Sequence, residues 1–386
     1  MAERGRGGTS PNPCVGAVLV RGTRTLGEGF HRAKGSPHAE VEALHGAAAA
    51  GHDVRGATAY VSLEPCNHHG ATPPCSAALI AAGIARVVAG TLDPNPRTAR
   101  GGVDRLRGAG IEVEVAGDPL AALLVEDFGV AIAAGRPYVR LKMAASLDGY
   151  VAPEPGRHQL TGGPAQAFVR DLRGAYDAVL AGAGTVRTDD PLLTVRPPRS
   201  RALPFRRVVA CGRTPPPAGS RIFAPLEGYV PTIVLAPGDA REAFASLEGV
   251  AEVVYVPAAR GHGTAGGRLE SAVPGGRLGS AVSGGRLDLT AALQALRARG
   301  ISSLLCEGGP RLAAALLGAG LVDRLDWLSA PVLLAGPLAV PALEPASGMH
   351  PIPALGANAY PRTQIRPDRV ERLGDDLLVS GRVERG

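Results

Sequence analysis

One histidine, one glutamate and two cysteines are spaced in the chain so that they could form a hydrolytic metal site. His38-Ala39-Glu40 is followed by Pro65-Cys66 and, after eight intervening residues, by Cys75. One imidazole and two thiolates suit a tetrahedral zinc ion whose fourth position is open to water, and zinc lowers the pKa of that water toward neutrality. Glu40 lies two residues from a ligand and is free to carry a proton to a departing amine. The set therefore predicts hydrolytic deamination of a ring amine or amidine.

The spacing of the two cysteines narrows the class of deaminase. A His-x-Glu sequence followed by Pro-Cys is typical of zinc-dependent nucleobase deaminases. Base and nucleoside deaminases normally carry Cys-x-x-Cys, whereas residues 67–74 separate Cys66 from Cys75. The alternative of a purely structural zinc site would require a fourth protein ligand, so the three-residue set favours catalysis.

Strand-like and helix-like segments alternate around these residues, as in an α/β layered domain. The pattern predicts strands over 15–20, 58–62 and 86–89, and helices over 38–50 and 74–82. His38 and Glu40 would then open one helix, and Cys66 and Cys75 would flank the start of the next. Helix N-termini direct backbone amides and a positive dipole toward a thiolate, which suits the predicted chemistry.

A second region repeats the alternation after a boundary near residues 135–137. The pattern predicts helices over 164–173, 288–298 and 310–319, and strands over 138–143, 178–181, 207–210, 232–235 and 303–306. Such alternation indicates a second α/β domain built for a nucleotide or a similar extended ligand. We therefore expect one domain over residues 1–137 and another over 138–386.

Residues 261–288 differ in character from the rest of the second region. Gly-Gly-Arg-Leu occurs there three times at a nine-residue period. That period is far below the length of a solenoid repeat, and the composition offers little apolar area to offset the entropy of ordering. We interpret the segment as a low-complexity surface insertion.

The overall composition disfavours several functional classes. A chain of 386 residues with 45% hydrophobic and 20% charged residues is an ordinary globular protein, long enough for two domains. Apolar runs are too short to span a bilayer and the N-terminal residues lack an apolar signal core, so we expect a cytoplasmic protein without a membrane partner. Five cysteines argue against a disulfide framework. The 41 basic residues are interleaved with 35 acidic ones and aromatic residues are only 4%, so nucleic acid is not the expected partner.

Two sets of motifs in the same order resemble the bifunctional deaminase and reductase family of riboflavin biosynthesis. The resemblance covers nearly the whole chain and is strongest over residues 10–18, 37–43, 62–75, 141–149, 182–191 and 306–310. It implies a cytidine-deaminase-like three-layer α/β domain followed by a dihydrofolate-reductase-like domain. The lack of a G-x-G-x-x-G sequence between a strand and a helix agrees with the latter rather than with a Rossmann domain.

For the first domain, the resemblance implies zinc-dependent deamination of a diaminopyrimidinone ribosylamine 5′-phosphate. One zinc ion per chain would be held by His38, Cys66 and Cys75, with Glu40 as proton shuttle. The implied substrate contacts are Asn12, His31 and His68. An Asn side chain offers a donor and an acceptor to a pyrimidine edge, and a His can meet a phosphate. The family usually has a helix before Pro-Asn-Pro, so with nine residues ahead of Ser10 we expect either that this helix is largely missing or that the true start lies upstream.

For the second domain, the resemblance implies reduction of the ribosyl group to ribityl with NADPH. The implied cofactor contacts are Ala144, Gln159, Thr161, Thr185, Asp189 and Gly309. The residues implied around the sugar phosphate are Lys142, Arg157, Arg173, Leu193, Arg196 and Glu307. Lys and Arg suit the phosphate, and Glu307 could orient ribose hydroxyls. Family members commonly associate through this domain, so a homo-oligomer is expected.

Departures from the family pattern leave alternatives open. Arg157-His158-Gln159-Leu160 stands where members often have Ser-Gln-Trp-Ile, and Cys211 stands where an Asp is usual. These differences motivate an alternative in which the reductase domain is inactive or takes another substrate. A second alternative is a non-catalytic, zinc-stabilised nucleotide-binding module. A third, a nucleic-acid base deaminase, is disfavoured by the long gap between the cysteines and by the lack of basic and aromatic patches.

Overall fold

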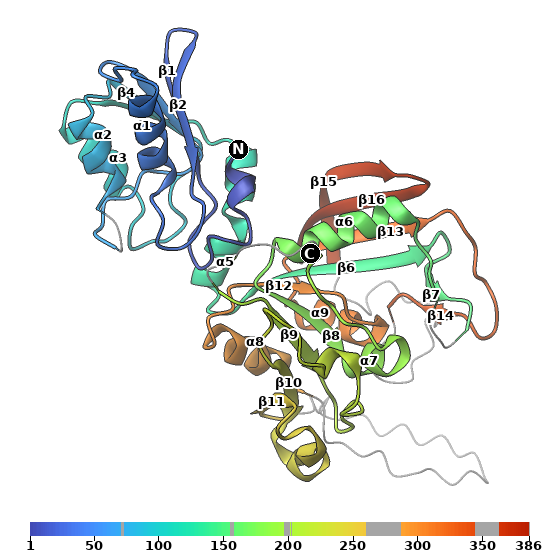
Figure 1. Ribbon diagram of the computed structural model, residues 1–386. Helices are drawn as coiled ribbons and strands as arrows, with labels where there is room; N and C mark the ends of the chain where they lie inside the picture. The colour runs from blue at the N-terminus through green and yellow to red at the C-terminus, as the bar shows by residue number, and fades with distance from the viewer. Residues whose placement is uncertain are drawn as a thin grey trace, which may run out of the picture.

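The computed structural model of the protein describes residues 1–70, 73–154, 158–196, 201, 203–259, 287–343 and 363–385. These residues form two units, each organised around its own β-sheet (Figure 1). Apart from residues 287 and 288, the insertion predicted over 261–288 lies outside the described residues.

The first unit contains a five-stranded sheet in the order β2-β1-β3-β4-β5. Strand β1 pairs antiparallel with both β2 and β3, whereas β3, β4 and β5 are parallel. Its strands and main helices are β1 (Gly16–Arg21), β2 (Arg24–Phe30), α1 (Ala39–Ala49), β3 (Thr58–Val61), α2 (Cys75–Ala81), β4 (Arg86–Ala89), α3 (Gly101–Gly108) and β5 (Glu112–Val115). Buried residues of α1, α2 and α3 share one core with the sheet, so the three helices cover the same face.

Helix α1 lies directly on the backbone of β2. Ala39 and Ala43 of α1 are fully buried. A Cβ atom added to Gly29 of β2 would lie 2.5 Å from the Ala43 nitrogen and 2.6 Å from the Ala39 oxygen. Glycine is needed there because any side chain would push the helix away. Since His38 caps the N-terminus of α1, this contact also sets the position of the first predicted metal ligand.

The second unit is built on a nine-stranded sheet in the order β11-β10-β9-β8-β12-β6-β13-β16-β15. The strands from β11 to β13 are parallel, and β16 and β15 add an antiparallel hairpin at one edge. The strands are β6 (Tyr138–Ser146), β8 (Ala178–Gly182), β9 (Arg206–Ala210), β10 (Thr232–Pro237), β11 (Ala251–Val256), β12 (Ser303–Cys306), β13 (Arg324–Ala330), β15 (Thr363–Leu373) and β16 (Asp376–Arg385). Separately, β7 (Tyr150–Ala152) pairs with β14 (Val340–Pro341).

Helices cover both faces of this second sheet. On one face, α8 (Leu289–Arg297) and α9 (Pro310–Ala319) share a core with the central strands. On the other, α6 (Gly163–Gly174) packs over β13 and β16, while η3 (Gly238–Leu247) and α7 (Ala183–Asp189) pack near β8, β9 and β10. Both faces are therefore buried, as a parallel sheet requires.

Helix α5 (Glu126–Ala133) precedes the expected domain boundary but packs against the second sheet. The Tyr138 hydroxyl donates a hydrogen bond to Glu126 Oε2 at 2.9 Å, and Val130 contacts the cluster around Tyr138. Helix α4 (Pro119–Leu124) leads into α5 from the first unit. Before Pro-Asn-Pro, where the resembling family usually has a helix, the structure has the short 3-10 helix η1 (Ala2–Gly5), in which Ala2 and Gly5 are buried.

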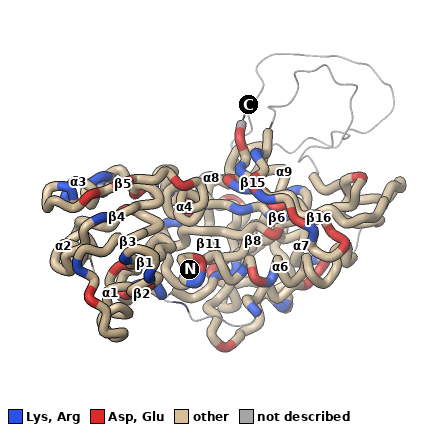
Figure 2. The backbone as a smooth tube through the Cα atoms, turned by 90° about the horizontal axis from the view of Figure 1, so that it is seen from above, with Lys and Arg blue, Asp and Glu red and all other residues tan. Residues whose placement is uncertain are grey.

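The charged residues are distributed over both units. Figure 2 shows Lys and Arg interspersed with Asp and Glu along the chain rather than gathered in one stripe. Several form cross-strand ion pairs, such as Arg86 with Glu112 at 3.1 Å. Among the described residues, the excess positive charge behind the formal value of +6 is therefore not concentrated in one region.

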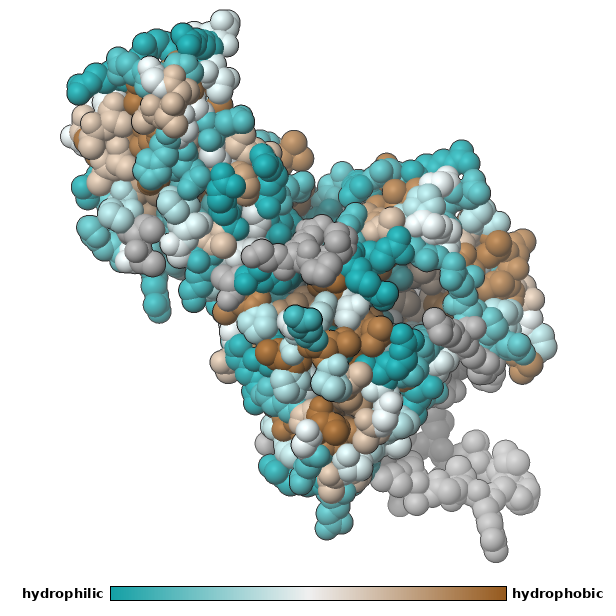
Figure 3. Space-filling model, viewed as in Figure 1, coloured by the Kyte–Doolittle hydropathy of each residue, from teal (hydrophilic) through white to brown (hydrophobic). Residues whose placement is uncertain are grey.

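Apolar side chains reach the surface near the β7 and β14 end of the second unit. Figure 3 shows a hydrophobic patch there on an otherwise mostly hydrophilic face. Leu147, Leu333 and Leu338, from the segments flanking these strands, are each more than 60% exposed, at 64%, 72% and 63%. None of the helices in the described ranges has the length and apolar character that crossing a bilayer demands.

The backbone contact between α1 and β2 gives a first testable prediction. We expect Gly29→Ala to lower the free energy of unfolding by about 1–3 kcal/mol, because the new methyl group overlaps the helix backbone. Gly46→Ala on the same helix is the matched control, since its nearest neighbour would be 3.5 Å away. That change should stabilise the helix by about 0.5–1 kcal/mol. Denaturant unfolding of both variants checks the prediction, and equal stability would contradict it.

Candidate active sites

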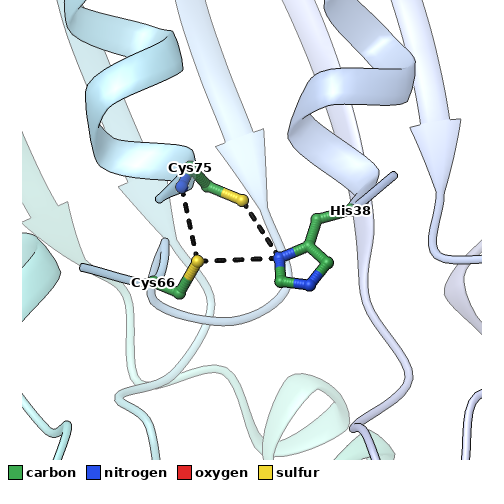
Figure 4. A group of neighbouring side chains, drawn as sticks. All are labelled: His38, Cys66 and Cys75. Carbon is green, nitrogen blue, oxygen red and sulfur yellow. Dashed lines mark hydrogen bonds between the residues drawn. The ribbon is translucent and has the colours of Figure 1, made fainter. Parts of the chain in front are cut away.

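The three predicted metal ligands converge in the first unit. His38 caps α1, Cys75 is the first residue of α2, and Cys66 lies in the loop after β3. Figure 4 shows the three side chains pointing toward one another, His38 and Cys75 from the starts of the two helices and Cys66 from the loop. His38 Nδ1 lies 3.2 Å from Cys75 Sγ and 3.6 Å from Cys66 Sγ. The ligand atoms all lie within 4.8 Å of one another, which confirms the grouping predicted from the sequence.

The electrostatics of this group suit a cation. A hydrogen bond from the Cys75 thiol lowers the pKa of Cys66 to about 4, helped by His38 and by the Cys75 backbone amide, which lies 3.3 Å from the sulfur. The hydrogen bond with Cys66 raises the pKa of His38. No further His, Cys, Asp or Glu of the described ranges joins the group. Two sulfurs and one imidazole nitrogen with a fourth position open fit a catalytic zinc ion.

Glu40 is buried beside the group, with 3% of its surface exposed. Burial raises the pKa of its carboxyl to about 7, and the negative charge of Cys66 contributes in the same direction. The side chain also interacts with Cys75. A carboxyl that gains and loses a proton near neutral pH is suited to general acid–base work.

Asn12 and His31 also lie close to this group of metal ligands. Asn12 Nδ2 lies 3.2 Å from His31 Nε2, and His31 Nδ1 lies 3.1 Å from the Pro37 carbonyl oxygen. A carbonyl only accepts, so Nδ1 carries the proton and Nε2 accepts from the Asn12 amide. The His31 ring meets the His38 ring edge-on, with 5.1 Å between centroids. Burial lowers the pKa of His31, so the neutral ring orients Asn12 rather than offering a charge.

His68 lies in the loop between the two cysteines and is exposed. Its imidazole is thus open to solvent on the segment that carries Cys66. The role of His68 in substrate binding stays a prediction.

Glu64 holds the loop that presents Cys66, a function that the sequence analysis missed. This buried carboxylate accepts hydrogen bonds from the backbone amides of Asp93, Arg100, Gly102 and Val103 at 2.9–3.2 Å. A Cβ atom on Gly102 would lie 1.7 Å from the Pro65 oxygen, so α3 starts in direct contact with the loop. The sequence feature that could have predicted this role is the acidic residue directly before Pro65-Cys66.

Three of the predicted reductase residues meet near the ends of the central strands of the second sheet. Arg173, in the last turn of α6, forms a two-pronged ion pair with Glu307, which follows β12. The Arg173 Nη2 to Glu307 Oε2 distance is 2.8 Å. Lys142 of β6 interacts electrostatically with both residues, and its burial lowers the pKa of the ammonium group. The structure therefore brings Lys142, Arg173 and Glu307 together.

Two predicted cofactor residues also meet. Gly309 caps α9, and Thr185 lies on α7. A Cβ atom on Gly309 would lie 3.1 Å from Thr185 Oγ1, so the starts of these two helices are in contact. Gly182 ends β8, and the helix α7 begins at the next residue. Asp189 ends α7 and Ala144 lies on β6.

The remaining predicted reductase residues are scattered. Arg157 lies outside the described residues, Gln159 and Arg196 are exposed, and the Thr161 carbonyl accepts a hydrogen bond from Gln166. Leu193 has a left-handed backbone with φ +50 and only 5% exposure. Its side chain belongs to the apolar core, so any ligand contact would come from its backbone.

Cys211, which stands where an Asp is usual in the resembling family, lies in the same apolar core as Leu193. Burial raises the pKa of its thiol to about 12. The side chain therefore contributes packing rather than charge at the end of β9.

Known families match both units. Residues 1–91 match the cytidine and deoxycytidylate deaminase zinc-binding region, and residues 137–379 match the RibD C-terminal domain. The riboflavin biosynthesis protein RibD of Escherichia coli is 38% identical over 98% of this chain and 95% of its own length. That of Aquifex aeolicus is 35% identical over 98% of this chain and 94% of its own.

Solved structures agree with this similarity. RibD of Acinetobacter baumannii is 33% identical, with a TM-score of 0.74 over 99% of this chain and 96% of that one. A diaminohydroxyphosphoribosylaminopyrimidine deaminase/5-amino-6-(5-phosphoribosylamino)uracil reductase from Thermotoga maritima is 31% identical, with a TM-score of 0.77 over 99% of this chain and 95% of that one. Both matches extend over the two units, which confirms the expected fold class.

The metal group predicts a specific zinc content. We expect about one zinc ion per chain in the purified protein and almost none in Cys66→Ser, because a serine hydroxyl replaces a thiolate in a three-ligand site. Cys14→Ser is the matched control, since the Cys14 thiol donates to the Ala2 carbonyl and is not part of the metal group. Elemental analysis after gel filtration measures the metal. Full zinc occupancy in Cys66→Ser would contradict the assignment.

Proposed function

The chain belongs to the RibD family of bifunctional deaminase–reductases of riboflavin biosynthesis, and from this premise we propose how its own residues perform the two steps. The substrate is a diaminopyrimidinone ribosylamine 5′-phosphate, which is first deaminated and then reduced with NADPH. The observation that carries the proposal is the convergence of His38, Cys66 and Cys75 beside a buried Glu40.

In the deamination step, Glu40 moves the proton. His38, Cys66 and Cys75 would hold the zinc ion, which when bound would supply a nucleophile at neutral pH by lowering the pKa of water. The Glu40 carboxyl would take up a proton beside the metal ligands and deliver it to the departing amine. Asn12, oriented by His31, presents its amide to the edge of the pyrimidine ring. His68, on the exposed loop, reaches the substrate from the solvent side.

In the reduction step, Arg173 and Lys142 attract the sugar phosphate and Glu307 orients the ribose hydroxyls. The ion pair with Arg173 fixes the carboxylate of Glu307 in one orientation, and Lys142 adds a cation beside it. NADPH would supply the hydride, and the starts of α9 and α7, where Gly309 and Thr185 lie in contact, would hold it. The other cofactor contacts proposed are Ala144, Gln159, Thr161 and Asp189, and those proposed for the sugar phosphate are Arg157, Leu193 and Arg196.

The domain boundary that we propose, at residues 137 and 138, is supported by the family match beginning at residue 137. We also propose a cytoplasmic enzyme that associates through its second unit. The exposed Leu147, Leu333 and Leu338 support such association, because apolar surface of this kind often marks an interface.

An enzyme with deaminase activity alone remains the alternative, and the exposed Gln159 is the observation behind it. This residue stands where the family often has a Trp, so the cofactor would lose an aromatic contact. NADPH consumption with the deaminated intermediate separates the two. Turnover at a rate comparable to deamination supports the bifunctional enzyme, and no turnover supports the alternative.

Glu40→Gln tests the proton shuttle. We expect deamination to fall by about a hundredfold or more, because the amide cannot take up the proton. Zinc content should stay at the wild-type level, since Glu40 is not a ligand. The reductase assay with the deaminated intermediate should be unchanged. Near-normal deamination by this variant would contradict the role given to Glu40.

Arg173→Gln tests the reductase site. We expect the KM for the deaminated intermediate to rise by about tenfold or more, because the phosphate loses a cation and Glu307 loses its partner. NADPH absorbance measures the rate, and deamination should be unaffected. The exposed Arg170 on the same helix gives the control Arg170→Gln, for which we expect wild-type kinetics. Equal kinetics for both variants would refute the assignment.

A further inference from the structure

The N-terminal segment formed by residues 5–12 lies between the two units. A Cβ atom on Gly5 would lie 2.2 Å from the His31 carbonyl oxygen, in the deaminase unit. A Cβ atom on Gly7 would lie 2.1 Å from the Gly174 carbonyl oxygen, at the end of α6 in the reductase unit. Gly7 also has a φ of +81, a conformation that suits glycine. The segment therefore touches both units at backbone contact distance.

One hydrogen bond ties this segment to the central sheet of the reductase unit. The Ser10 hydroxyl donates to Asp177 Oδ2 at 2.9 Å. The same oxygen accepts from the backbone amides of Ser302 and Ser303 at 2.8 and 3.0 Å. Asp177 is 7% exposed and directly precedes β8. Because the loop entering β12 holds this carboxylate in place, it is a rigid anchor for Ser10.

The segment leads from Ser10 directly to the deaminase site. Asn12 is two residues further on, its backbone amide bonds to the Thr9 carbonyl at 2.9 Å, and its side chain meets His31 beside His38. A cavity of about 30 Å³, enough for a single water, is lined by Ser10, Asn12 and Asp177. The hydrogen bond of Ser10 and the turn from Thr9 to Asn12 therefore hold Asn12 in place.

We propose that Asp177 of the reductase unit is a positioning residue for the deaminase site, acting through Ser10 on Asn12. The carboxylate touches no part of the deaminase substrate. It fixes the turn that presents the Asn12 amide, so affinity for the pyrimidine in the first unit depends on a bond made by the second. The inference rests on the proposed role of Asn12 against the pyrimidine ring.

Asp177 also has a structural role that the test must separate from positioning. Replacing Asp177 would release the amides of Ser302 and Ser303 and weaken the sheet itself. Ser10→Ala avoids this, because it removes only the bond to Ser10 and leaves the carboxylate with its backbone partners. Ser10→Thr keeps the hydroxyl and is the conservative rescue.

Tyr138→Phe is the matched control. It removes one hydroxyl-to-carboxylate hydrogen bond, from Tyr138 to Glu126, at the place where α5 meets the reductase sheet. This bond does not lead to Asn12. Any general loosening of the contact between α5 and the sheet would therefore appear in Tyr138→Phe as well as in Ser10→Ala.

The experiment measures deamination kinetics, zinc content and reductase activity for the full-length wild type and the three variants. For Ser10→Ala we expect the KM of deamination to rise about tenfold with a smaller change in kcat, because a neutral hydrogen bond that orients a binding residue is lost. Zinc content and reduction of the deaminated intermediate should match the wild type. Ser10→Thr and Tyr138→Phe should deaminate within about twofold of the wild type.

Three outcomes would overturn the inference: an unchanged KM in Ser10→Ala, an equal rise in Tyr138→Phe, or a Ser10→Thr variant as impaired as Ser10→Ala. These outcomes are distinct from failure of the proposed function. If the wild type itself does not deaminate the pyrimidine substrate, the proposed function fails and the inference fails with it. If the wild type is active and Ser10→Ala equals it, only the positioning role is lost.

Discussion

The backbone contact between α1 and β2 is the constraint on which the deaminase unit depends. Helix α1 carries His38 at its cap and Glu40 in its first turn, so the height of the helix above the sheet sets where both side chains lie. Because Gly27 and Gly29 have no side chains, the backbone of α1 can lie in direct contact with β2. Ala39 and Ala43 complete the contact without adding bulk. Cys66 is fixed in another way, because Glu64, two residues before it, accepts four backbone hydrogen bonds. Two independent supports thus meet at one metal site.

The reductase unit instead relies on charges placed along β6. Arg140 pairs with the fully buried Asp326, and two residues further along the strand Lys142 faces the Arg173 and Glu307 pair. These charges are expensive to bury unless they are paired and hydrogen-bonded. The phosphate that we propose to bind near Lys142 would therefore find cations already held in place by carboxylates. These side chains are already oriented when the protein has folded, so less conformational entropy is lost when a ligand binds.

The sequence predicted best what depends on short stretches of chain. The metal ligands follow from residue types at fixed spacing, and the apolar runs of β4, β12 and α9 were placed with their observed bounds. Strand β2 was missed because its two glycines are typical of loops, and their purpose is visible only once α1 lies on them. The burial of the Leu193 side chain and the pairing of Arg173 with Glu307 depend on contacts between segments that are far apart in the sequence. The hairpin β15 and β16 is largely exposed on its outer strand, so it carries little apolar periodicity.

The position of β12 has a consequence for the order in which the chain can assemble during synthesis. This strand lies between β6 and β8, yet it follows β9, β10 and β11 in the sequence. The first sheet closes with β5, long before β12 has left the ribosome, so the deaminase unit can fold while the centre of the second sheet is still missing a strand. Ser302 and Ser303 arrive with β12 and complete the partners of Asp177. The arrival of β12 therefore also secures Ser10, near the start of the chain, through its bond to Asp177.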